Sequence, residues 1–362
     1  MVVAVRGDAE ARVLSAHAVL VGEQPPGLGG TMRRSSSLLA GLAGALVLTL
    51  AALTAPAAVA GAPVATAPAY SVAEGDLDAS LTCDGDPTTG PTPVLLVPGT
   101  TLTPDLNFSW NYARQFTRAG RSWCWVELPG HAMRDIQVAG EYVAHAIRTL
   151  HEAAGRPISI VGFSQGGMVP RWALKYWPDT RAMVDDLIGL DPSNHGTLDA
   201  YPVCLVGCAP ALWQQRTGSA FLRALNADAE TWAGISYSQV FTATDEIVVP
   251  NIAPFASSAL STGEGEISNV LVQSICPVHV SDHLSMGTSD PVGHALVLDA
   301  LTHDGPADPA RISRAVCLRA LAPGISPASF ASNFTRVLAV AATQLVVAPR
   351  AYREPELADY AR

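Results

Sequence analysis

Short runs of apolar residues recur along the chain after residue 92, and each is typical of a strand buried on both faces. They cover residues 93–97, 123–128, 158–161, 184–190, 238–242 and 267–272. Helical periodicity lies between several of them, most clearly over residues 136–154, where Asp135 can cap the first turn and Gly155 can end the helix. Strands that alternate with helices predict an α/β fold whose mainly parallel sheet is covered by helices on both faces.

The residues before these strands have the composition of a leader. Residues 32–60 combine Arg33 and Arg34, an apolar run over 38–53 and an Ala-Val-Ala sequence at 58–60, which predicts a secretory signal peptide. The run is short for a membrane span, although a membrane anchor is the alternative. We expect residues 1–31 to be a dispensable N-terminal extension, 61–92 a tail and lead-in loop, and 93–362 a single domain.

The composition indicates a globular, exported protein. In a chain of 362 residues, 49% are hydrophobic and 15% are charged, which excludes a disordered chain. The net charge of −10 argues against nucleic acid and anionic lipid as partners. All six cysteines follow the signal, which predicts three disulfides in an oxidising compartment, in one of fifteen pairings. Lys175 is the single lysine, a bias that indicates a bacterial source with a GC-rich genome.

A serine between two glycines is the first candidate for chemistry. The sequence Gly162-Phe163-Ser164-Gln165-Gly166 lies between the strand at 158–161 and a helical stretch at 167–177. In that context G-x-S-x-G is a nucleophile elbow, a sharp turn that holds the serine in a strained conformation beside a helix N-terminus. The alternative is an ordinary strand-to-helix turn with an incidental serine, so the interpretation depends on whether an acid and a base follow.

Both residue types follow in the order that this motif requires. A serine hydroxyl needs a base that is oriented by a third group, and in elbow-containing folds the order is serine, acid, histidine. Asp191 and Asp245 each follow a predicted strand, and Asp245 is favoured as the acid. His279 and His283 share the loop after the last strand, and position favours His283 as the base.

Further segments are expected around this centre. The backbone N–H of Gln165 and the loop at 99–101, with the hydroxyl of Thr100, can stabilise an oxyanion. Residues 199–234 predict a small cap over the carboxyl ends of the strands, with a structural excursion as the alternative. The helical stripe at 325–347 is expected to pack in the core, or else to wall the pocket. We expect no metal site, because Cys204-x3-Cys208 lacks a histidine at zinc-ligand spacing.

Several sequence segments occur in the order known from one enzyme family. They are Leu81-Thr82-Cys83, residues 94–100, Trp123-Cys124-Trp125, Ser164-Gln165-Gly166-Gly167, Trp213-Gln214-Gln215, residues 242–248, Asp282-His283 and Glu354-Pro355. Over residues 75–360 the chain therefore resembles the Candida antarctica lipase B-like family of secreted α/β-hydrolase lipases. The resemblance implies an α/β-hydrolase fold, a triad of Ser164, Asp245 and His283, an oxyanion hole of Thr100 and Gln165, and Gln215 beside the acyl group. It also implies disulfides Cys83–Cys124 and Cys276–Cys317.

The chain departs from this family at the predicted substrate pocket. Phe163 stands where the family has tryptophan, Leu102 replaces a threonine of the alcohol-side pocket, and Ser193 replaces a pocket aspartate. The family's last disulfide is missing, and Cys204 and Cys208 are expected to form the third bridge instead. Stereoselectivity and alcohol preference are therefore not expected to carry over.

These features together predict a secreted serine hydrolase of carboxylic esters. The favoured function is a lipase that acts on acylglycerols or other lipid esters through an acyl-enzyme, at an oil–water interface, with neither cofactor nor metal. A short-chain esterase, a polyester hydrolase and an acyltransferase are alternatives on the same triad. A non-catalytic binding protein is disfavoured, because every triad residue type is present in order. No stable membrane span is expected after removal of the signal.

Overall fold

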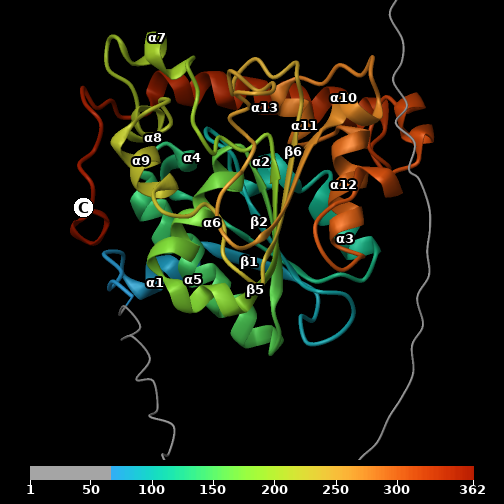
Figure 1. The fold of residues 1–362 in the computed structure, drawn as a ribbon, viewed down its shortest axis with the longest axis horizontal. Coiled ribbons are helices and arrows are strands. Elements are labelled where there is room, and N and C mark those ends of the chain that lie inside the picture. Colours follow the sequence, from blue (N-terminus) through green and yellow to red (C-terminus); the bar gives the residue numbers. More distant parts are fainter. Residues whose placement is uncertain (1–66) are drawn as a thin grey trace, which may run out of the picture. The chain divides into compact units, whose positions relative to one another are not determined.

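A seven-stranded sheet forms the centre of the computed structural model, which describes residues 67–362 and leaves the expected signal segment outside its range (Figure 1). The strand order is β1-β3-β2-β4-β5-β6-β7. The strands are β1 (Leu81–Asp84), β2 (Val94–Val97), β3 (Trp123–Val126), β4 (Ile158–Phe163), β5 (Val184–Leu190), β6 (Ser236–Phe241) and β7 (Glu266–Leu271). Strands β2 to β7 pair in parallel, whereas β1 lies antiparallel to β3 at one edge.

Helices cover both faces of this sheet, because successive side chains of each strand point to opposite sides. Leu95 and Val97 of β2 pack on one side, with the buried residues of α5 (Ile136–Ala154) and α6 (Gln165–Tyr176). Val94 and Leu96 pack on the other side, with α3 (Tyr112–Arg118) and α12 (Pro291–Ala300). Figure 1 shows the two helix layers on either side of the strands, which is the predicted α/β architecture.

Shorter helices occupy the connections between these elements. They are α1 (Glu74–Ala79), α2 (Pro104–Phe108), α4 (Pro129–Ala132), α7 (Ala200–Cys204), α8 (Pro210–Gln214), α9 (Ala220–Asn226), α10 (Val272–Ile275) and α11 (His283–Met286), together with 3-10 turns at Pro178–Met183, Pro309–Arg311, Arg314–Leu318 and Asp359–Ala361. Helices α7, α8 and α9 all fall in the segment that was expected to form a cap.

The caps predicted for α5 are confirmed. The side chain of Asp135 accepts a hydrogen bond from the backbone N–H of Gln137 at 2.9 Å, and Gly155 ends the helix in the left-handed region at φ 65°. The predicted strands also match the observed strands to within two residues at each end. Strands β2 to β7 were therefore predictable from hydrophobic patterning.

Two expectations are corrected by the structure. Residues 74–84, which were expected in a lead-in loop, form α1 and the edge strand β1, which a disulfide between Cys83 and Cys124 attaches to β3. Helix α13 (Pro327–Val347) was expected to pack in the core, yet Val337 is its one buried residue. Within residues 67–362, α13 alone has the length and apolar composition to cross a membrane. It lies across the same end of the sheet as α11 (Figure 1).

Candidate active site

Ser164 lies at a sharp turn between β4 and α6. Its backbone has φ 54° and ψ −121°. Residues other than glycine rarely adopt such a positive φ. A Cβ atom on Gly162 would lie 1.9 Å from the carbonyl oxygen of Gly166, and one on Gly166 would lie 2.0 Å from that of Val97. Glycine is therefore required at both flanking positions, as the elbow motif predicts.

His283 and Asp245 form a buried hydrogen-bonded pair at the same end of the sheet. Asp245 Oδ2 lies 3.0 Å from His283 Nδ1, and Asp245 Oδ1 accepts hydrogen bonds from the backbone N–H groups of Ile247 and Val248 at 2.8 Å each. Burial alone would raise the pKa of Asp245, but the charge and hydrogen bond of His283 and these two N–H donors hold it below its usual range. Asp245 is therefore ionised and holds the imidazole by its Nδ1.

Phe163 connects this pair to the elbow. Its ring packs against the His283 ring with 4.8 Å between centroids, and Phe163 directly precedes Ser164 in the chain. Among residues 67–362, His283 Nε2 makes no hydrogen bond, to Ser164 Oγ or to any other group. Catalytic hydrogen bonds are often long in sites without substrate, and Nε2 is the nitrogen that remains available for a proton.

Two glutamine side chains hold the hydroxyl of Thr100. Gln165 Nε2 and Gln215 Nε2 each lie 3.0 Å from Thr100 Oγ1. The same amide nitrogens donate to the carbonyl oxygens of Ala132 at 2.9 Å and Ala211 at 3.2 Å, which can only accept, so both amide orientations are determined. Thr100 Oγ1 thus accepts two hydrogen bonds, and its own proton is left to be donated elsewhere.

The predicted pocket residues are all buried, in different surroundings. Ser193 Oγ donates to Gln215 Oε1 at 2.9 Å, so it supports the glutamine that holds Thr100. Leu102 is fully buried in the hydrophobic core on the α3 side of the sheet. Phe163 is buried as well, against the imidazole of His283.

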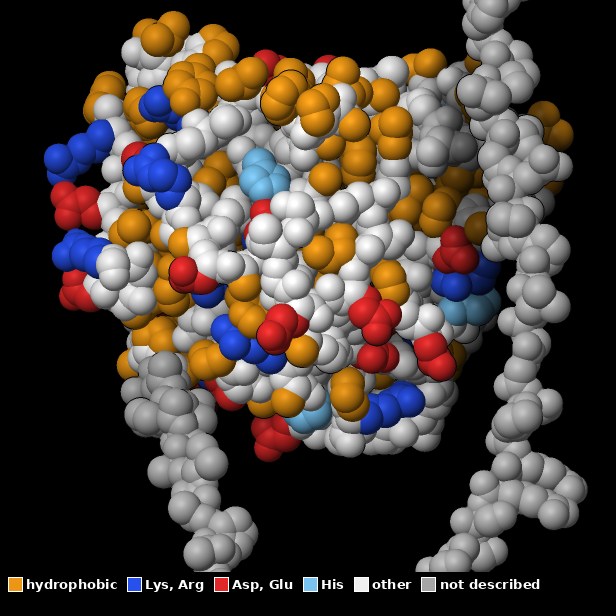
Figure 2. Space-filling view, in the orientation of Figure 1, with side chains coloured by type: hydrophobic (Ala, Val, Ile, Leu, Met, Phe, Trp, Pro, Cys, Tyr) orange, Lys and Arg blue, Asp and Glu red, His pale blue; other side chains and the backbone are white. Residues whose placement is uncertain are grey.

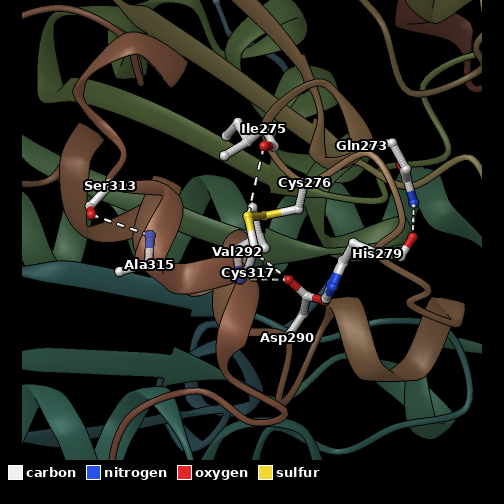
Figure 3. Close-up of a disulfide and its surroundings, with 10 residues drawn as sticks. Gln273, Ile275, Cys276, His279, Asp290, Val292, Ser313, Ala315 and Cys317 are labelled. Carbon is white, nitrogen blue, oxygen red and sulfur yellow. Dashed lines mark hydrogen bonds and ion pairs between the residues drawn. A yellow bond between two sulfur atoms is a disulfide. The ribbon is translucent and has the colours of Figure 1, made fainter.

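The second histidine of the loop lies in another environment. Figure 3 shows the disulfide between Cys276 and Cys317 near the start of this loop, with His279 turned toward Asp290. His279 Nε2 lies 2.5 Å from Asp290 Oδ2, and this hydrogen bond raises the pKa of His279. His279 is therefore engaged by an acid of its own, away from the pair formed by His283 and Asp245. The other two predicted bridges, Cys83–Cys124 and Cys204–Cys208, are also present.

Sequence patterns missed two asparagines of the site. Asn107 Oδ1 accepts from the N–H of Gly99 at 3.1 Å, and its Nδ2 donates to the carbonyl of Gly287 at 3.1 Å, which connects the loop of Thr100 to α11. Asn251 Nδ2 donates to Asp245 Oδ2 at 3.2 Å. No motif marks either residue, because their contacts depend on how the surrounding loops fold.

Asp191, the alternative acid, also faces the imidazole. Its Oδ2 lies 3.8 Å from His283 Nδ1, at the end of β5. Asp191, Asp245 and His283 offer ligand atoms within 4.8 Å of one another, a spacing that could also suit a metal ion. Asp245 and His283 are already hydrogen-bonded to each other in this cluster, as expected for an acid–base pair.

Exposed apolar side chains gather around this end of the molecule. Figure 2 shows them along the edge that carries α7, α13 and α10 in Figure 1. We call this group the apolar rim; it comprises Leu205 and Val206 after α7, Val346 and Val347 of α13, and Val278 and Val280 after α10, which are 60–94% exposed. A soluble protein rarely leaves so many large apolar side chains in water at one place without a partner for them.

The sheet, the elbow and the buried His–Asp pair define the chain as an α/β hydrolase. No protein-family model matches it. It is 35% identical to lipase B of Pseudozyma antarctica over 331 residues, 90% of this chain and 94% of that protein. The crystal structure of Aspergillus fumigatus lipase B superimposes with a TM-score of 0.77 and 33% identity, covering 84% of this chain and 76% of the other.

The chain therefore belongs to the lipase B family. This agrees with the resemblance noted in the sequence and with the predicted α/β-hydrolase fold. Both relatives are fungal, so they lend no support to the expected bacterial source.

Proposed function

We propose that this protein is a secreted serine hydrolase that cleaves lipid esters, such as acylglycerols, through an acyl-enzyme. The observation that carries the proposal is the buried His283–Asp245 pair beside a serine held at φ 54°. The lipase B relatives support an ester-cleaving activity, and the three disulfides are consistent with an oxidising compartment. The proposed signal peptide lies outside the described residues.

In this mechanism each residue has one role. Ser164 Oγ attacks the acyl carbon while His283 Nε2 takes its proton, and Asp245 stabilises the imidazolium through Nδ1. The Thr100 hydroxyl and the backbone N–H of Gln165 donate to the oxyanion. The imidazolium then protonates the departing alcohol, and water, deprotonated by His283, releases the acid and regenerates the serine. The residues need no cofactor for these steps.

A fluorophosphonate label followed by peptide mapping tests the nucleophile directly. We expect one adduct, on Ser164, and a loss of about 10⁴-fold or more in kcat for Ser164→Ala. His283→Gln should lower kcat by a similar factor. His279→Gln, a matched change in the same loop, should lower kcat by less than about tenfold. An adduct on another residue, or substantial turnover by Ser164→Ala, would refute the proposal.

The apolar rim favours a lipid substrate over a short soluble ester. Large apolar side chains around a catalytic site can enter an oil phase, and each contributes about 1 kcal/mol when about half of it is buried. The double variant Leu205→Ser with Val206→Ser loses about 2 kcal/mol of this contribution and should therefore hydrolyse an emulsified triglyceride about 30-fold more slowly. Its rate on dissolved p-nitrophenyl butyrate should change much less.

A matched control is Leu298→Ser, which removes a partly exposed leucine of α12, a helix that packs on one face of the sheet. It should alter neither rate appreciably. Equal losses on the emulsion and on the soluble ester would argue for a short-chain esterase instead. A steep fall in rate on p-nitrophenyl esters longer than four carbons would lead to the same conclusion.

A further inference from the structure

Asp191 carries a buried carboxyl group that the proposed mechanism does not use. The residue is fully buried at the end of β5. Its Oδ1 accepts hydrogen bonds from the backbone N–H of Thr242 at 2.9 Å and from Asn251 Nδ2 at 3.3 Å. Its Oδ2 has no hydrogen-bond partner among the described residues and lies 3.8 Å from His283 Nδ1. An unpaired polar atom in the interior is costly, so this position calls for an explanation.

Asn251 joins Asp191 to the acid of the proposed triad. The same Nδ2 atom donates to Asp191 Oδ1 at 3.3 Å and to Asp245 Oδ2 at 3.2 Å. The two carboxyl groups therefore approach one imidazole from neighbouring positions, one following β5 and one following β6. Asp245 is the closer, at 3.0 Å against 3.8 Å from His283 Nδ1.

The environment decides which of the two acids is ionised. Asp245 receives two backbone N–H groups in addition to His283 and Asn251, all of which favour its charged form. Burial, followed by the negative charge of Asp245, raises the pKa of Asp191 well above its usual range, and Asp290 and Glu246 act in the same direction. The Thr242 N–H opposes this only in part. Two adjacent buried carboxylates would repel each other, so this arrangement favours a proton on Asp191 while Asp245 is ionised.

We propose that Asp191 is a reserve acid for His283, which holds the site's extra proton while Asp245 is ionised and hydrogen-bonds Nδ1 when Asp245 cannot. The inference rests on the proposed function, because it concerns the same imidazole. Asp191 acts through His283 and is a positioning residue. Its Oδ2 needs to approach Nδ1 by less than 1 Å to match the present distance of Asp245. When Asp191 takes over, its proton leaves to solvent and the carboxylate accepts the Nδ1–H.

Four proteins test this: the parent, Asp191→Asn, Asp245→Asn and the double variant, compared by kcat/KM on a soluble ester. Asparagine at 191 keeps Oδ1 as the acceptor for Thr242 and Asn251, so the fold has no reason to change. Loss of an oriented triad acid costs about 10⁴-fold when nothing replaces it. With the reserve acid present, we expect Asp245→Asn to lower kcat/KM by only about 10²-fold. The double variant should lower kcat/KM by the full factor of about 10⁴. Asp191→Asn alone should lose less than about tenfold.

The pH profile separates a reserve acid from a merely structural residue. A carboxylate near an imidazole raises the pKa of the imidazole. The acid limb of kcat/KM should therefore lie at lower pH in the double variant than in Asp245→Asn. Glu266→Gln is the matched control in the Asp245→Asn background, since this carboxyl group is exposed at the first residue of β7, at the opposite end of the parallel strands from His283. This change should leave kcat/KM, and the pH at which its acid limb lies, close to the values for Asp245→Asn alone.

The outcomes distinguish this inference from the proposed function. If Asp245→Asn is as inactive as the double variant, with the same acid limb, Asp191 is not a reserve acid, although the loss in Ser164→Ala still supports serine catalysis. If Asp245→Asn does not fold, infrared difference spectroscopy of the parent against Asp191→Asn at neutral pH provides a second test. A protonated-carboxyl C=O band that Asp191→Asn removes supports the proposal, and absence of that band overturns it.

Discussion

Removal of the Thr100 hydroxyl should reduce catalysis and stability by separate amounts that the structure allows to be worked out. Thr100→Val keeps the shape of the side chain and deletes Oγ1, the atom that Gln165 Nε2 and Gln215 Nε2 both bond at 3.0 Å. Since both lone pairs of Oγ1 are occupied, the deleted proton is the one free to reach an oxyanion. Loss of one such donor lowers kcat by about 10²- to 10³-fold, or about 2.7–4 kcal/mol of transition-state stabilisation.

The effect on stability arises from the two amides. Each keeps its bond to a backbone carbonyl, at Ala132 or Ala211, and loses its second partner. An unsatisfied buried donor costs about 1–3 kcal/mol. Because Thr100 is partly exposed, water can replace some of the lost hydrogen bonding. We therefore expect the free energy of unfolding to fall by about 1–3 kcal/mol.

Steady-state kinetics on p-nitrophenyl butyrate and urea unfolding measure these two quantities. KM should change little, because the proposed partner of the hydroxyl is an oxyanion that exists only in the transition state. Thr100→Ser is the control, since it retains the hydroxyl and should keep kcat within about tenfold of the parent. A Thr100→Val protein whose kcat stays within a few-fold of the parent, or a Thr100→Ser protein that loses as much as Thr100→Val, would refute the reasoning.

Two further predictions concern stability. Burial raises the pKa of Asp186 to about 7, despite the hydrogen bond from Ser159 Oγ, so the folded protein binds this proton more tightly than the unfolded chain. Stability from this group is complete below the unfolded pKa and is lost as pH rises through about 7. In urea unfolding, the free energy of unfolding of Asp186→Asn should therefore equal that of the parent near pH 4 and exceed it near pH 8 by up to about 4 kcal/mol. Equal free energies of unfolding at pH 8 would contradict this prediction. Replacing both cysteines of the Cys83–Cys124 bridge, 41 residues apart, should cost about 4 kcal/mol, against about 2 kcal/mol for the Cys204–Cys208 bridge, 4 residues apart. Equal losses in urea unfolding would rule out loop entropy as the cause.

Hydrophobic patterning was sufficient for strands β2 to β7 and failed at the edge strand β1 and at helix α13. Strands β2, β4 and β5 are covered by helices on both faces, so nearly every position is buried and an apolar run is visible in the sequence. Strand β1 (Leu81–Asp84) is an exposed edge strand with no apolar run, and it is held by pairing and a disulfide. Helix α13 has the composition of a core helix but lies mostly on the surface, which periodicity cannot reveal.

The elbow could be predicted because its requirement is local. Gly162 and Gly166 are needed by atoms within a few residues or in the adjacent strand, so the motif carries its own structural reason. The choice between His279 and His283 was less certain, since both lie in one loop. The structure brings His279 to Asp290 and His283 to Asp245, through side-chain contacts that depend on how that loop folds back on the sheet.

The order of residue types along the chain was therefore enough to indicate an α/β hydrolase with a serine elbow, an acid and a histidine, because strand burial and steric crowding act over short distances. Only the tertiary structure brought a second carboxyl group to the imidazole, joined the two carboxyl groups through Asn251, bound Thr100 with two glutamines, and left α13 exposed. Most of these contacts join segments that the sequence separates by tens of residues, and their energies depend on distance and burial in three dimensions.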